Sequence, residues 1–108
     1  MTTKRTIKFR AFIKAGNKKI MVYYPSLVDT RQEGLMEFTG LKDKNGKEIY
    51  EGDIIKSDNF FITRLPLVVK FENGCFIAEN KGRGLNNIHN QPVEIIGNIY
   101  ENKEKLVK

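Results

Sequence analysis

The chain has 108 residues, of which 40% are hydrophobic and 30% charged, with seven Phe and four Tyr. This is the size of one domain with one core, and the composition excludes a disordered chain. No apolar run approaches the roughly eighteen residues of a membrane span, and no apolar stretch follows the basic start as in a secretion signal. We therefore expect a single cytoplasmic domain over residues 1–108, with residues 102–108 as a flexible tail or short helix.

The net charge of +6 is concentrated at the N-terminus. Residues 1–20 hold seven basic side chains and no acid, whereas residues 21–60 carry −3 and the rest +2. A basic end attracts phosphate backbones or acidic proteins. Lysines also cover the solvent face of a strand without any partner, so both interpretations stay open here.

The first strand pattern lies over residues 6–14, where apolar and basic side chains alternate. A period of two predicts a buried face made of Ile7, Phe9, Ala11 and Ile13. It predicts a solvent face made of Lys8, Arg10, Phe12 and Lys14. A turn at residues 15–17 and a returning strand at residues 20–24 complete an expected hairpin.

The middle of the chain is expected to hold a loop at residues 26–34, a strand at residues 35–39 and a turn at Asn45-Gly46. A two-residue turn there would set Asp43 opposite Glu48, and like charges in that position are unfavourable. A wider loop therefore stays open as an alternative. Gly52 is expected to mark a bend or bulge before a strand that begins at Asp53.

The clearest hairpin lies over residues 67–78, around Asn73-Gly74. Its two-residue turn pairs Phe71 with Phe76, and an aromatic pair favours the same register. Residues 60–63 are expected at a sheet edge, residues 79–92 in the longest loop and residues 93–100 in the last strand. Six to eight short antiparallel strands with little helix predict a mostly β fold, either a small barrel or a sandwich.

No group of residues has the spacing of a catalytic or metal site. His89 is the only histidine and Cys75 the only thiol, and nothing in the sequence pairs them. An acidic group contains Glu48, Glu51, Asp53 and Asp58, but its spacing matches no motif, and Asp53 is expected to accept turn amides. We expect no enzyme, no cofactor and no metal.

A nucleic-acid surface is predicted if two basic segments converge. These segments contribute Lys8, Arg10, Lys14, Lys81 and Arg83. The aromatic residues that would stack bases beside them are Tyr23, Tyr24, Phe60 and Phe61. Core positions compete for the same aromatic residues, and residues 81–84 are by default a flexible loop.

Four blocks of the chain resemble the YopX family: residues 8–12, 35–55, 69–74 and 93–102. They span nearly the whole chain, with Phe12 standing where tryptophan is expected, a difference that affects packing. The resemblance implies a small β-rich protein encoded by phages and prophages of Gram-positive bacteria and relatives. It implies no catalytic motif, because the family has no established biochemical function.

The leading hypothesis is a non-catalytic phage accessory protein. It would bind a host or phage protein in the cytoplasm, or assemble with itself, through strand edges that pair with another chain. The alternative is a small nucleic-acid-binding β-barrel that uses the basic N-terminal hairpin.

Overall fold

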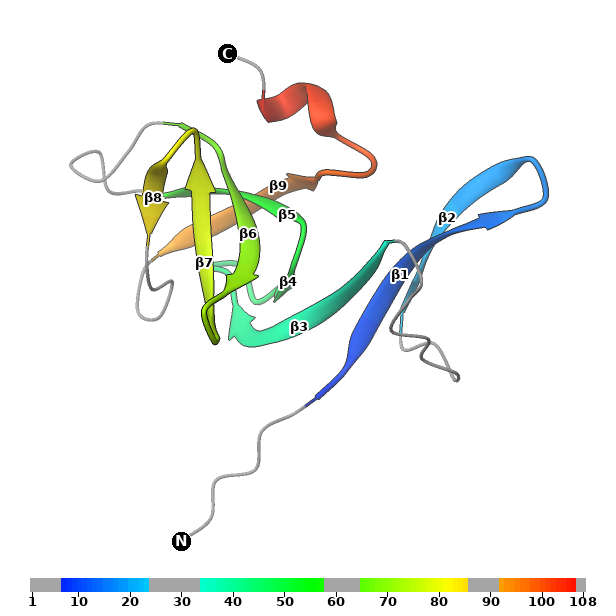
Figure 1. Cartoon of the computed structure of the whole chain (residues 1–108), viewed down its shortest axis with the longest axis horizontal. Helices are drawn as coiled ribbons and strands as arrows, with labels where there is room; N and C mark the ends of the chain where they lie inside the picture. Colours follow the sequence, from blue (N-terminus) through cyan, green and yellow to red (C-terminus); the bar gives the residue numbers. More distant parts are fainter. Residues whose placement is uncertain (1–6, 24–33, 58–64, 86–91, 107–108) are drawn as a thin grey trace, which may run out of the picture.

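A computed structural model describes residues 7–23, 34–57, 65–85 and 92–106 of the chain (Figure 1). These residues contain nine strands and one turn of 3-10 helix. The elements are β1 (Phe9–Ala15), β2 (Lys18–Tyr23), β3 (Leu35–Lys42), β4 (Glu48–Tyr50), β5 (Asp53–Ser57), β6 (Leu67–Glu72), β7 (Cys75–Asn80), β8 (Arg83–Leu85), β9 (Val93–Asn98) and η1 (Lys103–Leu106). The expected mostly β fold is confirmed.

The strands form two antiparallel sheets. The first has the order β2-β1-β3-β4 and the second the order β8-β7-β6-β5-β9. Figure 1 shows the β1–β2 hairpin projecting at one end of the molecule, whereas the five-stranded sheet curls at the other. The chain passes from one sheet to the other between β4 and β5, at residues 51–52.

The short strand β4 contributes to two separate hydrophobic clusters. Its Ile49 belongs to a cluster of the second sheet, which also contains Ile55, Leu67, Val69, Ala78 and Val93. Its Tyr50 belongs to a cluster of the first sheet, with Met36 and Phe38. Neighbouring residues of a strand point to opposite sides, so one three-residue strand serves both clusters.

The N-terminal hairpin is confirmed, with Ala15 opposite Lys18 across a two-residue turn. The prediction of its two faces was right for Ala11, which is buried, and for Lys14, which is exposed, but wrong for three other residues. Arg10 is only 4% exposed and Phe12 packs against the first-sheet cluster, whereas Ile7 is 66% exposed. The alternation was identified correctly, but β1 is an inner strand of its sheet, and its basic face also packs against the molecule at Arg10 and Phe12. The strand is therefore covered on both faces, at Ala11 on one and at Arg10 on the other.

The turn after β3 is the wider of the two alternatives. Lys42, and not Asp43, lies opposite Glu48. The Asp43 carboxylate accepts hydrogen bonds from the main chain of the turn, which removes the repulsion that a two-residue turn would have created.

Gly52 marks the expected bend, with φ of 84°, and β5 begins at Asp53 as predicted. A Cβ at Gly52 would lie 2.9 Å from the buried Met36 Sδ. Gly52→Ala is expected to lower the free energy of unfolding by about 2 kcal/mol, from backbone strain and this contact together. Gly46 has the same φ but open space around it. Urea denaturation should therefore find Gly46→Ala clearly less destabilising, and equal losses would contradict the packing argument.

The β6–β7 hairpin has the predicted register, with Phe71 opposite Phe76 and Val69 opposite Ala78. The loop predicted for residues 79–92 was wrong in its first part. β7 continues to Asn80 and β8 follows after a turn at residues 81–82. This polar edge pairing was missed because it buries little apolar surface and leaves no hydrophobic period. The last strand ends at Asn98, and the tail forms the short helix η1.

Several predictions fall on residues that the structure does not describe. These are the edge pairing of residues 60–63, and the placement of Tyr24, Asp58, Phe60, Phe61 and His89.

Candidate functional site

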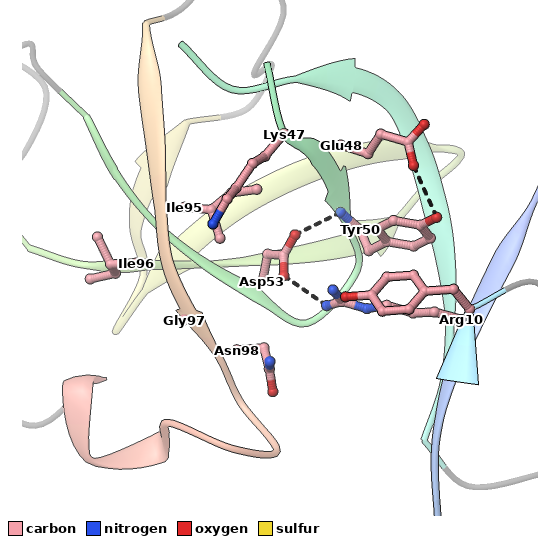
Figure 2. Close-up of a pocket in the computed structure, with 10 residues that line it drawn as sticks. Arg10, Lys47, Glu48, Tyr50, Asp53, Ile95, Ile96, Gly97 and Asn98 are labelled. Atoms are coloured by element: carbon pink, nitrogen blue, oxygen red, sulfur yellow. Dashed lines mark hydrogen bonds and ion pairs between the residues drawn. The ribbon is translucent and has the colours of Figure 1, made fainter. Parts of the chain in front are cut away.

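A cleft of about 460 Å³ lies where the two sheets meet (Figure 2). Five strands and the turn before β4 supply its walls. The lining residues are Arg10, Tyr23, Lys47, Glu48, Tyr50, Asp53, Ile95, Ile96, Gly97 and Asn98. They span most of the chain, so the cleft exists only when both sheets are assembled.

A buried ion pair forms the floor of this cleft. Arg10 Nη2 on β1 lies 2.7 Å from Asp53 Oδ1 on β5, and Asp53 is 2% exposed. The other Asp53 oxygen accepts the Tyr50 N–H at 2.8 Å, as expected for a carboxylate that satisfies a turn amide. The guanidinium lies over the Tyr50 ring, 4.7 Å from its centroid. One pair therefore connects the two sheets.

The buried ion pair is electrostatically costly. Burial raises the pKa of Asp53 above its ordinary value, although the Arg10 charge and the Tyr50 N–H act in the opposite direction. Burial also raises the pKa of Glu51, whose carboxylate accepts the Glu37 N–H. Buried pairs of this kind often add less stability than apolar residues of the same shape would.

The rim of the cleft carries Glu48 and Lys47. Glu48 forms an ion pair with Lys8 and accepts a hydrogen bond from the Tyr50 hydroxyl at 3.3 Å. Lys8 also lies 4.5 Å above the Phe38 ring. Lys47 is exposed, and its side chain reaches across the opening toward Ile95 on β9 (Figure 2).

Asp43 fixes the turn before β4 against β9. Its Oδ1 accepts the N–H groups of Asn45 and Lys47, both at 2.9 Å, and its Oδ2 accepts the Ile95 N–H at 3.0 Å. The pKa of Asp43 is lowered, because these N–H groups outweigh the opposing effect of burial. Aspartate at the start of an Asn-Gly turn was an available sequence signal, but its contact with β9 was not.

The predicted basic surface does not form as a single patch. The prediction of an exposed Arg10 was wrong, and Lys8 is partly buried against Glu48. Lys14 is exposed at the hairpin tip, and Lys81 is exposed in the β7–β8 turn at the opposite end of the molecule (Figure 1). Arg83 lies in β8, and its side chain is outside the described part.

Of the predicted stacking residues, Tyr23 lies at the mouth of the cleft. It is half exposed and meets the Tyr50 ring edge-on at 5.8 Å. Within the described ranges, no three His, Cys, Asp or Glu side chains are placed to hold a metal ion, and Cys75 is exposed. No helix in the same residues has the length and hydropathy that crossing a membrane requires.

A family model described as YopX protein matches residues 14–107. The chain belongs to the YopX family. A crystal structure of protein EF1440 from Enterococcus faecalis is similar to this YopX-family chain, with a TM-score of 0.59 and 24% identity over 95% of this chain and 99% of the other. At that identity the likeness supports the fold alone. The search of curated proteins gives no match for this YopX chain.

Proposed function

We propose that this YopX-family chain is a non-catalytic binding module. It takes an extended segment of a partner protein as an additional strand on the outer edge of β2. The observation that carries this proposal is that no described residue pairs with the outer main chain of β2, beside the exposed apolar side chain of Ile20. The family resemblance supports a phage or prophage accessory role in the cytoplasm of a bacterial host.

The outer edge of β2 offers hydrogen-bonding groups. Phe12 N–H donates to Gly34 O, so this residue of β1 directs its main chain toward β3. Its cross-strand neighbour Met21, and Lys19 two residues earlier, therefore direct theirs away from β1. Within the described residues, nothing bonds to the main-chain groups that Met21 and Lys19 direct outward.

The long edge of the other sheet is closed by the protein itself. Asp43 accepts the Ile95 N–H, and Lys44 N–H donates to Val93 O at 2.9 Å. Lys105 Nζ donates to Ile96 O at 2.6 Å. Such covering prevents unwanted strand pairing, so the contrast with β2 supports a use for the open edge.

The chemistry around β2 favours an apolar and acidic partner. One face of the hairpin carries the Ala11–Val22 and Ile13–Ile20 pairs; Ala11 is buried, Ile13 and Val22 are half-buried, and Ile20 is 44% exposed, so the apolar surface open to a partner lies at Ile20. At the tip, Lys14 lies directly opposite Lys19, and these two exposed lysines form no ion pair with a described residue. Like charges directly opposite are destabilising, and acidic side chains on an added strand would relieve the repulsion.

The test is selection from a displayed library of random peptides, followed by fluorescence titration of the selected peptides. We expect alternating apolar and acidic sequences. Lys19→Pro should weaken their binding about tenfold or more, because it removes an outward N–H and obstructs pairing. Lys19→Thr keeps the N–H and removes only an exposed charge, so it should cost at most about fivefold. Equal effects of the two variants would contradict strand addition.

A second candidate, nucleic-acid binding, is favoured by the basic hairpin tip alone. A pull-down distinguishes nucleic-acid binding from strand addition. Tagged protein is incubated with host lysate, with and without nuclease and at two salt concentrations. Recovery of nucleic acid that is lost at high salt would support this candidate. A protein whose capture survives nuclease and is lost in Lys19→Pro but kept in Lys19→Thr would support strand addition.

A further inference from the structure

We infer that the cleft between the two sheets binds a compact oxyanion, a carboxylate or phosphoryl group carried by a small molecule. Arg10 and Lys47 would be its two donors. This inference is independent of strand addition at β2, because it concerns different atoms and a different class of ligand.

Arg10 has one side-chain nitrogen to which no described residue bonds. Its Nε donates to Met36 Sδ at 3.4 Å, and its Nη2 donates to Asp53 and to Glu51 O. No described residue bonds to its Nη1. Among the described residues, every side-chain nitrogen or oxygen that is fully buried from solvent has a hydrogen-bond partner. Nη1 is therefore accessible to solvent, and Arg10 is one of the residues that line the cleft.

The guanidinium is fixed before any ligand arrives. The side chain is nine-tenths buried or more, held by Asp53 on one side and by the Tyr50 ring on its face. A donor that is already ordered loses little freedom on binding. Arginine N–H groups also form short, charge-assisted hydrogen bonds with carboxylate and phosphate oxygens.

Each acid of the cleft already has a basic partner: Asp53 pairs with Arg10 itself, and Glu48 pairs with Lys8, so the charge of Lys47 is not offset by either. The Asp53 oxygens accept from Arg10 and Tyr50, and Glu48 pairs with Lys8 and accepts from the Tyr50 hydroxyl. Lys47 forms no ion pair with a described residue. The two positive and two negative side chains of the lining balance, and Lys8, which pairs with Glu48 from outside the lining, leaves one positive charge in excess around the cleft. This excess favours a ligand group with one negative charge.

The experiment is an amide NMR titration of the full chain with inorganic phosphate and, separately, acetate, at constant ionic strength set with chloride. We expect saturable shifts at Ile96, Gly97 and the Arg10 Nε. Lys47→Gln should weaken the affinity about tenfold, as expected for one charge-assisted hydrogen bond. The main-chain bond from Lys47 to Asp43 is kept in this variant, so the turn should remain folded.

Lys44→Gln is the matched control, since Lys44 lies in the same turn and does not line the cleft. Its affinity should stay within about twofold of the parent, because an exposed charge outside the site is screened. A preference for phosphate assigns a phosphoryl ligand, and a preference for acetate assigns a carboxylate. Shifts that do not saturate, that miss the cleft, or that weaken equally in both variants would overturn the inference.

Discussion

Arg10→Met is expected to lower the free energy of unfolding by about 3–5 kcal/mol, as measured by urea denaturation at neutral pH. The substitution leaves the Asp53 carboxylate buried without its counter-charge, and Asp53 is only 2% exposed. Methionine has a similar length, so lost packing adds little to the effect. Replacing Lys70 of the more exposed Lys70–Glu79 pair by methionine should lower the free energy of unfolding by less than about 1 kcal/mol.

Two results separate charge from shape in this prediction. The double variant Arg10→Met, Asp53→Asn should be more stable than Arg10→Met alone, because it buries no unpaired charge. Burial raises the pKa of Asp53, and losing Arg10 removes the main opposing effect. A raised pKa makes the folded state bind its proton more readily, so the stability of Arg10→Met should increase as the pH falls toward 4. A loss unchanged by the double substitution and by pH would show that charge is not its cause.

Asp43→Ala is expected to lower the free energy of unfolding by about 3 kcal/mol at neutral pH. It removes the acceptor of three main-chain N–H groups, one of which connects the turn to β9. The pKa of Asp43 is lowered, so its contribution is complete above the unfolded-state pKa of roughly 3.9 and is lost as the pH falls through the folded-state pKa. The stabilities of parent and variant should therefore begin to converge as the pH falls below about 4.

Asp43→Asn isolates the contact between the turn and β9. Its amide oxygen can still accept from Asn45 and Lys47, whereas its amide nitrogen cannot accept from Ile95. The loss of stability should be smaller than in Asp43→Ala, and amide exchange at Ile95 should become faster. Parent-like exchange at Ile95 in Asp43→Asn would mean that the contact does not hold β9 in place.

The two hairpins could be predicted from the sequence because their signals are local. Gly16-Asn17 and Asn73-Gly74 select two-residue turns, and a turn of known length fixes the register beside it. The bend at Gly52 is local for the same reason. The polar strand β8 has no such signal, since it pairs with β7 through the main chain at an edge.

The cleft could not be predicted because its contacts join distant segments. Arg10 and Asp53 are 43 positions apart, and only the assembly of two sheets shows that a basic residue in an alternating strand is buried. The alternation of β1 predicts one apolar face, but it could not show that the strand is buried on both faces at Arg10 and Ala11. The sequence suggests only a repulsion between Asp43 and Glu48. In the fold the Asp43 carboxylate also accepts the N–H of Ile95, which is 52 positions away.

The three-residue strand β4 has a mechanical consequence for the cleft. Ile49 and Tyr50 are anchored in different clusters, one belonging to each sheet. A rocking motion of one sheet against the other would pull one of these side chains out of its packing, which is costly. We therefore expect the width of the cleft to stay nearly constant when a ligand binds. A ligand would enter an opening that is already shaped, with no closing step to slow its arrival or its release.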